Sequence, residues 1–196
     1  MKKEVIAVDV DEVLFPFTDR FLQHHNHTYG TKLDLDDFIS YEYHEVLGLP
    51  TADTVERVYE FHRLDHNHIE PLKEAREAIM ALSDKYHIAA VTARHPEFGD
   101  QTRAWLDLHF ETKFHDVIAI GYEHAMDVPF TKAEICKQIN AVALIDDSLD
   151  HVAKCAAQGV QGILFGDYPW TARKNIPTEV VRCRNWPEAL RYLNVS

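Results

Sequence analysis

Acidic and hydroxyl side chains follow directly after three short apolar runs of the sequence. Each run has the length and composition of a buried β-strand. The groups are Asp9 and Asp11 after residues 5–8, Thr92 after residues 87–91, and Asp146, Asp147 and Ser148 after residues 141–145. Ligands of an open parallel sheet bind beyond the carboxyl ends of its strands, so we expect these groups to converge on one edge. A lone Asp-x-Asp would most simply form a turn, but carboxylates at the ends of separate strands favour a functional site.

Four carboxylates at one edge repel one another unless a cation lies among them. Oxygen ligands of this kind suit Mg²⁺, which prefers a few carboxylates together with water and substrate phosphate. The residue types and their spacing therefore predict a magnesium site that handles a phosphorylated ligand.

The elements that position these groups alternate along the chain. Apolar runs that we interpret as strands cover residues 5–8, 87–91, 116–120, 141–145 and 161–165. Stripes with helical spacing lie between them, and Thr131 with Glu134 is typical of a capping box at a helix start. This alternation predicts an α/β fold with a doubly wound, Rossmann-like parallel sheet, for which we expect the strand order 3-2-1-4-5.

One long stretch breaks this alternation between the first strand and a helix that contains Leu72. Residues 17–29 and about 51–66 have helical patterns, and the whole stretch is too long for an ordinary strand-to-helix connection. We predict a helical cap domain at residues 15–70, inserted into an α/β core of residues 1–14 and 71–196.

Composition restricts the partners. The net charge of −12 argues against a nucleic-acid polymer but is compatible with a small phosphorylated substrate, since a bound metal reverses the local charge. No apolar run approaches the ~20 residues of a membrane helix, and the N-terminus does not read as a signal peptide. The three cysteines are widely spaced, as expected for free thiols. We expect a cytoplasmic enzyme with no membrane partner, as a monomer or homodimer.

Four segments resemble, in order, the four motifs of the haloacid dehalogenase-type phosphatase superfamily. They are Val8-Asp9-Val10-Asp11-Glu12-Val13-Leu14, Val91-Thr92-Ala93-Arg94, Lys132, and Leu144-Ile145-Asp146-Asp147-Ser148. The match spans about residues 4–166, and within the superfamily the chain is most similar to the 5′-nucleotidase branch that includes deoxyribonucleotidases. Glu12 stands where the family usually has Gly; a positive φ there would disfavour Glu, or the side chain could point into the cap interface.

The resemblance implies how the acidic residues act. Asp9 would attack phosphorus and form an aspartyl-phosphate. Asp11 would protonate the leaving oxygen and then deprotonate the attacking water. Asp9, the backbone carbonyl of Asp11 and Asp147 would hold Mg²⁺, with Asp146 as a further ligand or an orienting group.

The resemblance also implies the phosphate contacts. Thr92 and the backbone N–H groups that follow it, at Ala93 and Arg94, would grip phosphate oxygens. Lys132 would neutralise both the phosphate and Asp9. Its place in a first helical turn is electrostatically unfavourable, which supports a functional reason, although a solvated lysine is the alternative. Arg94 would contact phosphate or pair with a carboxylate.

Aromatic and histidine residues of the cap leave two interpretations open. Phe15, Phe17, Tyr41 and Tyr43 flank the expected entrance, where they would stack on a nucleobase or form the core of the cap. His62 and His66 share a helix face, but the spacing signatures of zinc sites are missing. We expect His124 and His151 to be surface residues.

These observations predict a Mg²⁺-dependent phosphomonoester hydrolase for a small metabolite such as a nucleoside 5′-monophosphate. A sugar phosphate is the alternative substrate. A non-catalytic phospho-ligand binding module would not need Asp11 as a general acid, and the long insert argues against a receiver-like domain.

Overall fold

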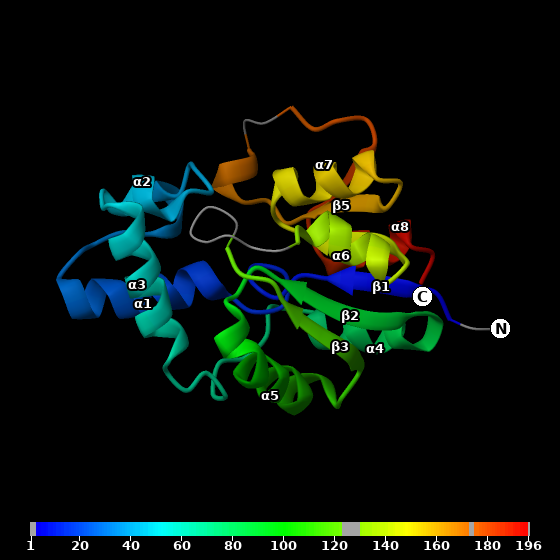
Figure 1. Cartoon of the computed structure of the whole chain (residues 1–196), viewed down its shortest axis with the longest axis horizontal. Helices are drawn as coiled ribbons and strands as arrows, with labels where there is room; N and C mark the ends of the chain where they lie inside the picture. Colours follow the sequence, from blue (N-terminus) through cyan, green and yellow to red (C-terminus); the bar gives the residue numbers. More distant parts are fainter. Residues whose placement is uncertain (1–2, 123–129, 173–174, 196) are drawn as a thin grey trace.

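A six-stranded parallel sheet forms the centre of the molecule (Figure 1). The computed structural model describes residues 3–122, 130–172 and 175–195. The strands are β1 (Val5–Val8), β2 (His87–Thr92), β3 (Phe114–Ala119), β4 (Ala141–Asp146), β5 (Gln161–Phe165) and β6 (Val180–Cys183). Their order is β3-β2-β1-β4-β5-β6, which confirms the doubly wound α/β fold and the predicted order of the first five strands.

Helices cover both faces of the sheet because successive strand side chains point to opposite sides. In β1, Ile6 and Val8 join a core with α4 (Ala75–Lys85), α5 (Gly99–Phe110) and α8 (Trp186–Tyr192). Ala7 instead packs on the other face, with α6 (Lys132–Gln138) and α7 (Leu149–Ala157). Both faces of the central strands are therefore buried, which explains why they read as continuous apolar runs.

A helical insert lies beyond the carboxyl ends of the strands, at the left of Figure 1. It contains α1 (Phe17–Tyr29), the 3₁₀ turn Leu35–Asp37, α2 (Tyr43–Leu47) and α3 (Thr51–His62). Rings of Phe17, Phe21 and Phe61 pack on one another at centroid distances of 5.5–5.9 Å. The same hydrophobic cluster continues into the α/β core, so apolar packing attaches the insert to the sheet. The division into a core of residues 1–14 and 71–196 and a cap of residues 15–70 stays a prediction.

Several elements differ from the sequence prediction. β6 and α8 were not predicted, because β6 is a four-residue edge strand and α8 has only seven residues. The stripe around Leu72 becomes helical only at Ala75, and α3 ends at His62 rather than near residue 66.

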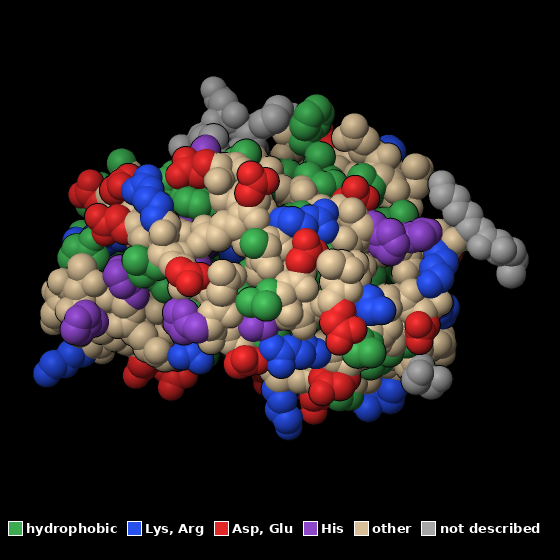
Figure 2. All heavy atoms as spheres, turned by 90° about the horizontal axis from the view of Figure 1, so that it is seen from below, with side chains coloured by type: hydrophobic (Ala, Val, Ile, Leu, Met, Phe, Trp, Pro, Cys, Tyr) green, Lys and Arg blue, Asp and Glu red, His purple; other side chains and the backbone are tan. Residues whose placement is uncertain are grey.

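The surface agrees with the acidic composition. Acidic and basic side chains are interspersed over the face seen in Figure 2, without a continuous basic patch. Among the described residues, we find no helix of the length and apolarity that crossing a membrane requires.

Candidate active site

Strand register brings the first and fourth motifs together. Val8 pairs with Ala90 of β2 on one side and with Ile145 of β4 on the other. The next residue, Asp9, remains fixed to β4 because its N–H donates to the Ile145 carbonyl at 2.9 Å. Asp9 and Asp146 consequently emerge side by side at the carboxyl edge of the sheet, as the sequence predicted.

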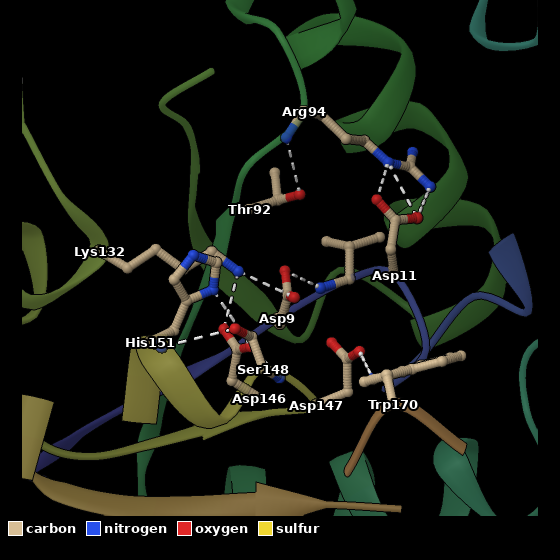
Figure 3. A network of polar contacts seen from close by, with 11 residues as sticks. Asp9, Asp11, Thr92, Arg94, Lys132, Asp146, Asp147, Ser148, His151 and Trp170 are labelled. Atoms are coloured by element: carbon tan, nitrogen blue, oxygen red, sulfur yellow. Dashed lines mark hydrogen bonds and ion pairs between the residues drawn. The ribbon is translucent and has the colours of Figure 1, made fainter. Parts of the chain in front are cut away.

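Lys132 lies between these two carboxylates (Figure 3). Its Nζ is 2.8 Å from Asp9 Oδ2 and 2.7 Å from Asp146 Oδ2, and the side chain is fully buried. The expected capping box of Thr131 and Glu134 starts α6 and places Lys132 at the first helical position. Burial opposes the charged form of Lys132, but Asp146 and Asp9 outweigh it and raise its pKa above the usual value. The alternative of a solvated lysine is therefore wrong.

Asp146 is held by several donors at once. Besides Lys132, the Ser148 N–H donates to Asp146 Oδ1 at 2.8 Å, and His151 Nδ1 lies 3.3 Å from the same oxygen. Burial works against its ionised form, yet Lys132 and then His151 lower the pKa of Asp146 below its usual range. The expectation that His151 is a surface residue is wrong. His151 is only 9% exposed, because it lies in the first turn of α7, which faces Asp146. His124 lies outside the described residues.

Asp9, Asp146 and Asp147 form a possible cation site. Each offers a carboxylate oxygen, and these oxygens lie within 4.8 Å of one another. Burial raises the pKa of Asp9 to about 7. Lys132 lowers this pKa, whereas the nearby carboxylates of Asp146 and Asp11 raise it further. Burial, followed by Asp146, likewise raises the pKa of Asp147. One lysine does not balance three buried carboxylates, so the donor set fits a divalent cation with oxygen preference.

Arg94 grips Asp11 through both carboxylate oxygens. The distances are 2.6 Å from Nη2 to Oδ1, and 3.0 and 3.2 Å from Nε to Oδ2 and Oδ1. A second Arg94 contact to the Thr102 hydroxyl, at 3.2 Å, fixes the buried guanidinium. The sequence left open whether Arg94 contacts phosphate or pairs with a carboxylate, and in this structure it pairs with the carboxylate of Asp11. The Asp11 carboxylate consequently lies outside the cluster of three.

Glu12 has both features that its departure from the family pattern suggested, a positive φ and a side chain that points toward the cap. Its φ is +59°, a conformation that Gly adopts more easily than Glu. Its carboxylate turns toward the insert and accepts a 2.6 Å hydrogen bond from the Thr18 N–H in the first turn of α1. Burial, followed by the neighbouring Asp11, raises the pKa of Glu12 to about 8.

Most of the remaining expected residues line a pocket between the sheet edge and the insert. Thr92 is fully buried and its hydroxyl accepts the Arg94 N–H at 3.2 Å, above Asp9 in Figure 3. Ala93, Arg94, Phe17, Tyr41 and Tyr43 line the pocket together with Asp11. Phe15 does not line it: the ring is buried beneath the Arg94 guanidinium, 4.9 Å from ring centroid to Cζ.

Sequence reasoning missed Trp170, which contacts Asp147. It lies in a 3₁₀ turn after β5, and its indole N–H donates to Asp147 Oδ2 at 3.1 Å. The available signal was position, since Tyr168, Pro169 and Trp170 follow a strand that ends at the same edge as β1 and β4.

A parallel sheet of this order, a helical insert after β1, and a lysine between the carboxylates of β1 and β4 define a phosphatase of the haloacid dehalogenase type. The sequence profile of the family described as 5′ nucleotidase, deoxy (Pyrimidine), cytosolic type C protein matches residues 3–195. The chain belongs to this family. A comparison with curated proteins found no match.

Solved structures share the fold at low sequence identity. The protein tyrosine kinase PtkA of Mycobacterium tuberculosis has a TM-score of 0.73 at 14% identity, with 99% of each chain covered. A haloacid dehalogenase-like hydrolase from Streptococcus pneumoniae has a TM-score of 0.69 at 13% identity, covering 97% of this chain and 98% of that chain. The HAD hydrolase YfnB of Bacillus subtilis, a structure with bound magnesium, has a TM-score of 0.64 at 14% identity over the whole of both chains.

Proposed function

We propose that this phosphatase is a Mg²⁺-dependent hydrolase of nucleoside 5′-monophosphates that works through an aspartyl-phosphate. The observation that carries this proposal is the position of Asp9. Its carboxylate meets the Lys132 ammonium on one side and shares a possible cation site with Asp146 and Asp147 on the other. Asp11, two residues further on, lines the adjoining pocket.

The metal would be held by Asp9, Asp147 and the backbone carbonyl of Asp11, with Asp146 as a further ligand or an orienting group. When bound, Mg²⁺ would offset the negative charge of the phosphoryl group and the carboxylates. The B. subtilis structure of the same fold is bound to magnesium, which supports Mg²⁺ as the cation of this proposal.

The protein side chains would carry out two displacements. In the first, an Asp9 oxygen bonds to phosphorus while the bond between phosphorus and the ester oxygen of the substrate breaks. Asp11 gives a proton to this leaving oxygen, which departs as the alcohol. In the second, Asp11 takes a proton from water, whose oxygen bonds to phosphorus and releases Asp9. Lys132 and the groups at Thr92, Ala93 and Arg94 would hold the phosphoryl oxygens.

The pocket beside Asp11 supports a nucleoside as the leaving group. Its lining includes Thr54, Val58, Tyr59 and His62 of α3, together with Phe17, Tyr41 and Tyr43. Flat aromatic and aliphatic walls suit the faces of a base. A sugar phosphate would leave most of these rings unused and is the second candidate substrate.

Three further expectations belong to this proposal. Residues 15–70 act as the cap that selects the substrate, the enzyme works in the cytoplasm as a monomer or homodimer, and neither nucleic-acid polymers nor membranes are its partners.

A substrate panel tests the proposal. Deoxyribonucleoside and ribonucleoside 5′-monophosphates, sugar phosphates and nitrophenyl phosphate would be compared with Mg²⁺ and with excess EDTA. We expect kcat/KM to be highest for a nucleotide and turnover to vanish in EDTA. Undiminished turnover in EDTA would refute the metal requirement, and a clear preference for sugar phosphates would refute the nucleotide assignment.

A further inference from the structure

Trp170 supports a carboxylate of the active site from outside it. Its indole N–H donates to Asp147 Oδ2 (Figure 3), and Trp170 is 4% exposed. The other oxygen, Asp147 Oδ1, makes no hydrogen bond to any described residue, and Asp147 belongs to the set of three carboxylates that fits a cation. One oxygen is therefore held while the other stays available.

From this geometry we infer that Trp170 is a positioning residue for metal binding, which fixes the Asp147 carboxylate so that Oδ1 faces the cation. The inference rests on the proposed function, because it requires that Asp147 ligates Mg²⁺. Partners that hydrogen-bond to metal-ligating carboxylates set their orientation, and losing one typically weakens metal affinity by about 10- to 100-fold.

The loop after β5 holds Trp170 in place. The Trp170 and Tyr168 rings stack with a centroid distance of 4.6 Å and an interplanar angle of 4°. The Tyr168 hydroxyl donates to the Glu12 carbonyl at 2.5 Å, which ties this loop to the turn after Asp11. Gly166 begins the loop with a φ of +85°, and a Cβ there would lie 2.2 Å from the Tyr168 ring. Trp170 is thus anchored both to the first motif and to the fourth.

Rotation of the indole is restricted on its remaining side as well. The Tyr41 ring of the insert meets Trp170 edge-on, with ring centroids 6.4 Å apart. A side chain packed between two rings loses little further freedom when its N–H is engaged, so it is a rigid donor rather than a mobile one.

The first test uses the intact wild-type protein. The chain has three tryptophans, so a ¹H–¹⁵N spectrum contains three indole N–H signals. Trp105→Phe and Trp186→Phe assign the Trp170 signal by elimination. Titration with Mg²⁺ should shift the Trp170 signal and leave the Trp105 signal in place, because the Trp105 N–H donates to the Ile69 carbonyl elsewhere.

The second test is Trp170→Phe, which keeps a ring for stacking on Tyr168 and removes the N–H. Binding of Mn²⁺, followed by electron paramagnetic resonance, should weaken by about 10-fold, and excess Mg²⁺ should restore most of kcat. Trp105→Phe is the matched control, since it also removes a buried indole hydrogen bond, and its Kd for Mn²⁺ should equal that of wild type.

The outcomes separate this inference from the proposed function. An equal Kd in Trp170→Phe and wild type, or a Trp170 signal that does not move at saturating Mg²⁺, would overturn the inference alone. A wild-type protein that binds neither ion and turns over substrate in EDTA would overturn the proposed function, and the inference with it. If Trp170→Phe does not fold, the wild-type titration still decides.

Discussion

Arg94 and Asp11 form a bidentate ion pair at the edge of the active-site pocket, with their closest atoms 2.6 Å apart. Such a pair requires the ionised, proton-accepting form of the carboxylate. This form suits the second displacement of the proposed mechanism, in which Asp11 takes a proton from water. The pair also fixes where the carboxylate lies, and small misplacements of a catalytic group cost about 10²-fold in rate.

Arg94→Gln removes the guanidinium and leaves Asp11 without its partner. We expect the second displacement to slow by about 10²-fold, so that kcat falls and phosphorylated enzyme accumulates. A burst of nitrophenol from nitrophenyl phosphate in stopped flow would reveal that accumulation. Arg103→Gln, which loses an arginine bonded to the Phe114 carbonyl, is the control and should show wild-type kcat. A variant with unchanged kcat and no burst would contradict the role of Arg94.

Asp11→Asn keeps the size of the side chain and removes the acid. We expect kcat/KM for a nucleotide to fall by about 10²–10⁴-fold, the usual contribution of general acid–base catalysis. The loss should shrink for nitrophenyl phosphate, whose leaving group hardly needs a proton. Binding of a phosphate mimic should persist. Equal losses in kcat/KM for good and poor leaving groups would exclude Asp11 as the general acid.

Asp9→Asn removes the nucleophile and one ligand of the proposed cation. Turnover of every substrate should drop by several orders of magnitude, because no covalent intermediate can form. Asp107→Asn on α5 serves as the control, since Asp107 pairs with Arg103 away from the site. Rates near wild type in Asp9→Asn would remove Asp9 from its role.

The sequence predicted that Asp9 and Asp146 meet at one edge of the sheet, because the information for this prediction is local, while the roles of these residues stay predictions. Asp9 and Asp146 end apolar runs long enough to be recognised as buried strands, and parallel strands bring such ends to one edge. The start of α6 was equally predictable, since the side chains of Thr131 and Glu134 each accept a hydrogen bond from the other residue's backbone N–H group.

Features that depend on packing between distant segments were not predictable in the same way. His151 has the spacing of a surface residue on α7, and only the fold turns it toward Asp146. Trp170 lies far along the chain from Asp147, and β6 contributes a half-buried edge strand with little periodicity. The positive φ of Glu12 could be suspected from the family pattern, but its bond to Thr18 could not.

Histidines buried in the insert should make the fold sensitive to acid. Burial, followed by the nearby Arg94, lowers the pKa of His66 from 6.5 to about 4. Between these values the unfolded chain binds a proton that the folded chain does not, so stability is complete above pH 6.5 and declines as the pH falls toward 4.

His66→Phe keeps the ring contact with Phe61 and removes this proton uptake. Urea unfolding at several pH values gives the slope of the unfolding free energy against pH, which measures how many more protons the unfolded chain binds than the folded chain. Between pH 4 and 6.5 this number should be smaller in His66→Phe than in wild type, by up to about one proton. His27→Gln, at an exposed position of α1, should leave the slope as in wild type. An unchanged slope in His66→Phe would show that His66 is not the residue responsible.

The stereochemical course at phosphorus tests the central claim, a covalent intermediate on Asp9, most directly. A phosphorothioate monoester made chiral with two oxygen isotopes would be hydrolysed, in the presence of Mg²⁺, in water that carries the third isotope, and the configuration of the released thiophosphate determined. Two successive in-line displacements each invert phosphorus, so the account predicts overall retention. Overall inversion would mean that water attacks the substrate directly, and would contradict the aspartyl-phosphate.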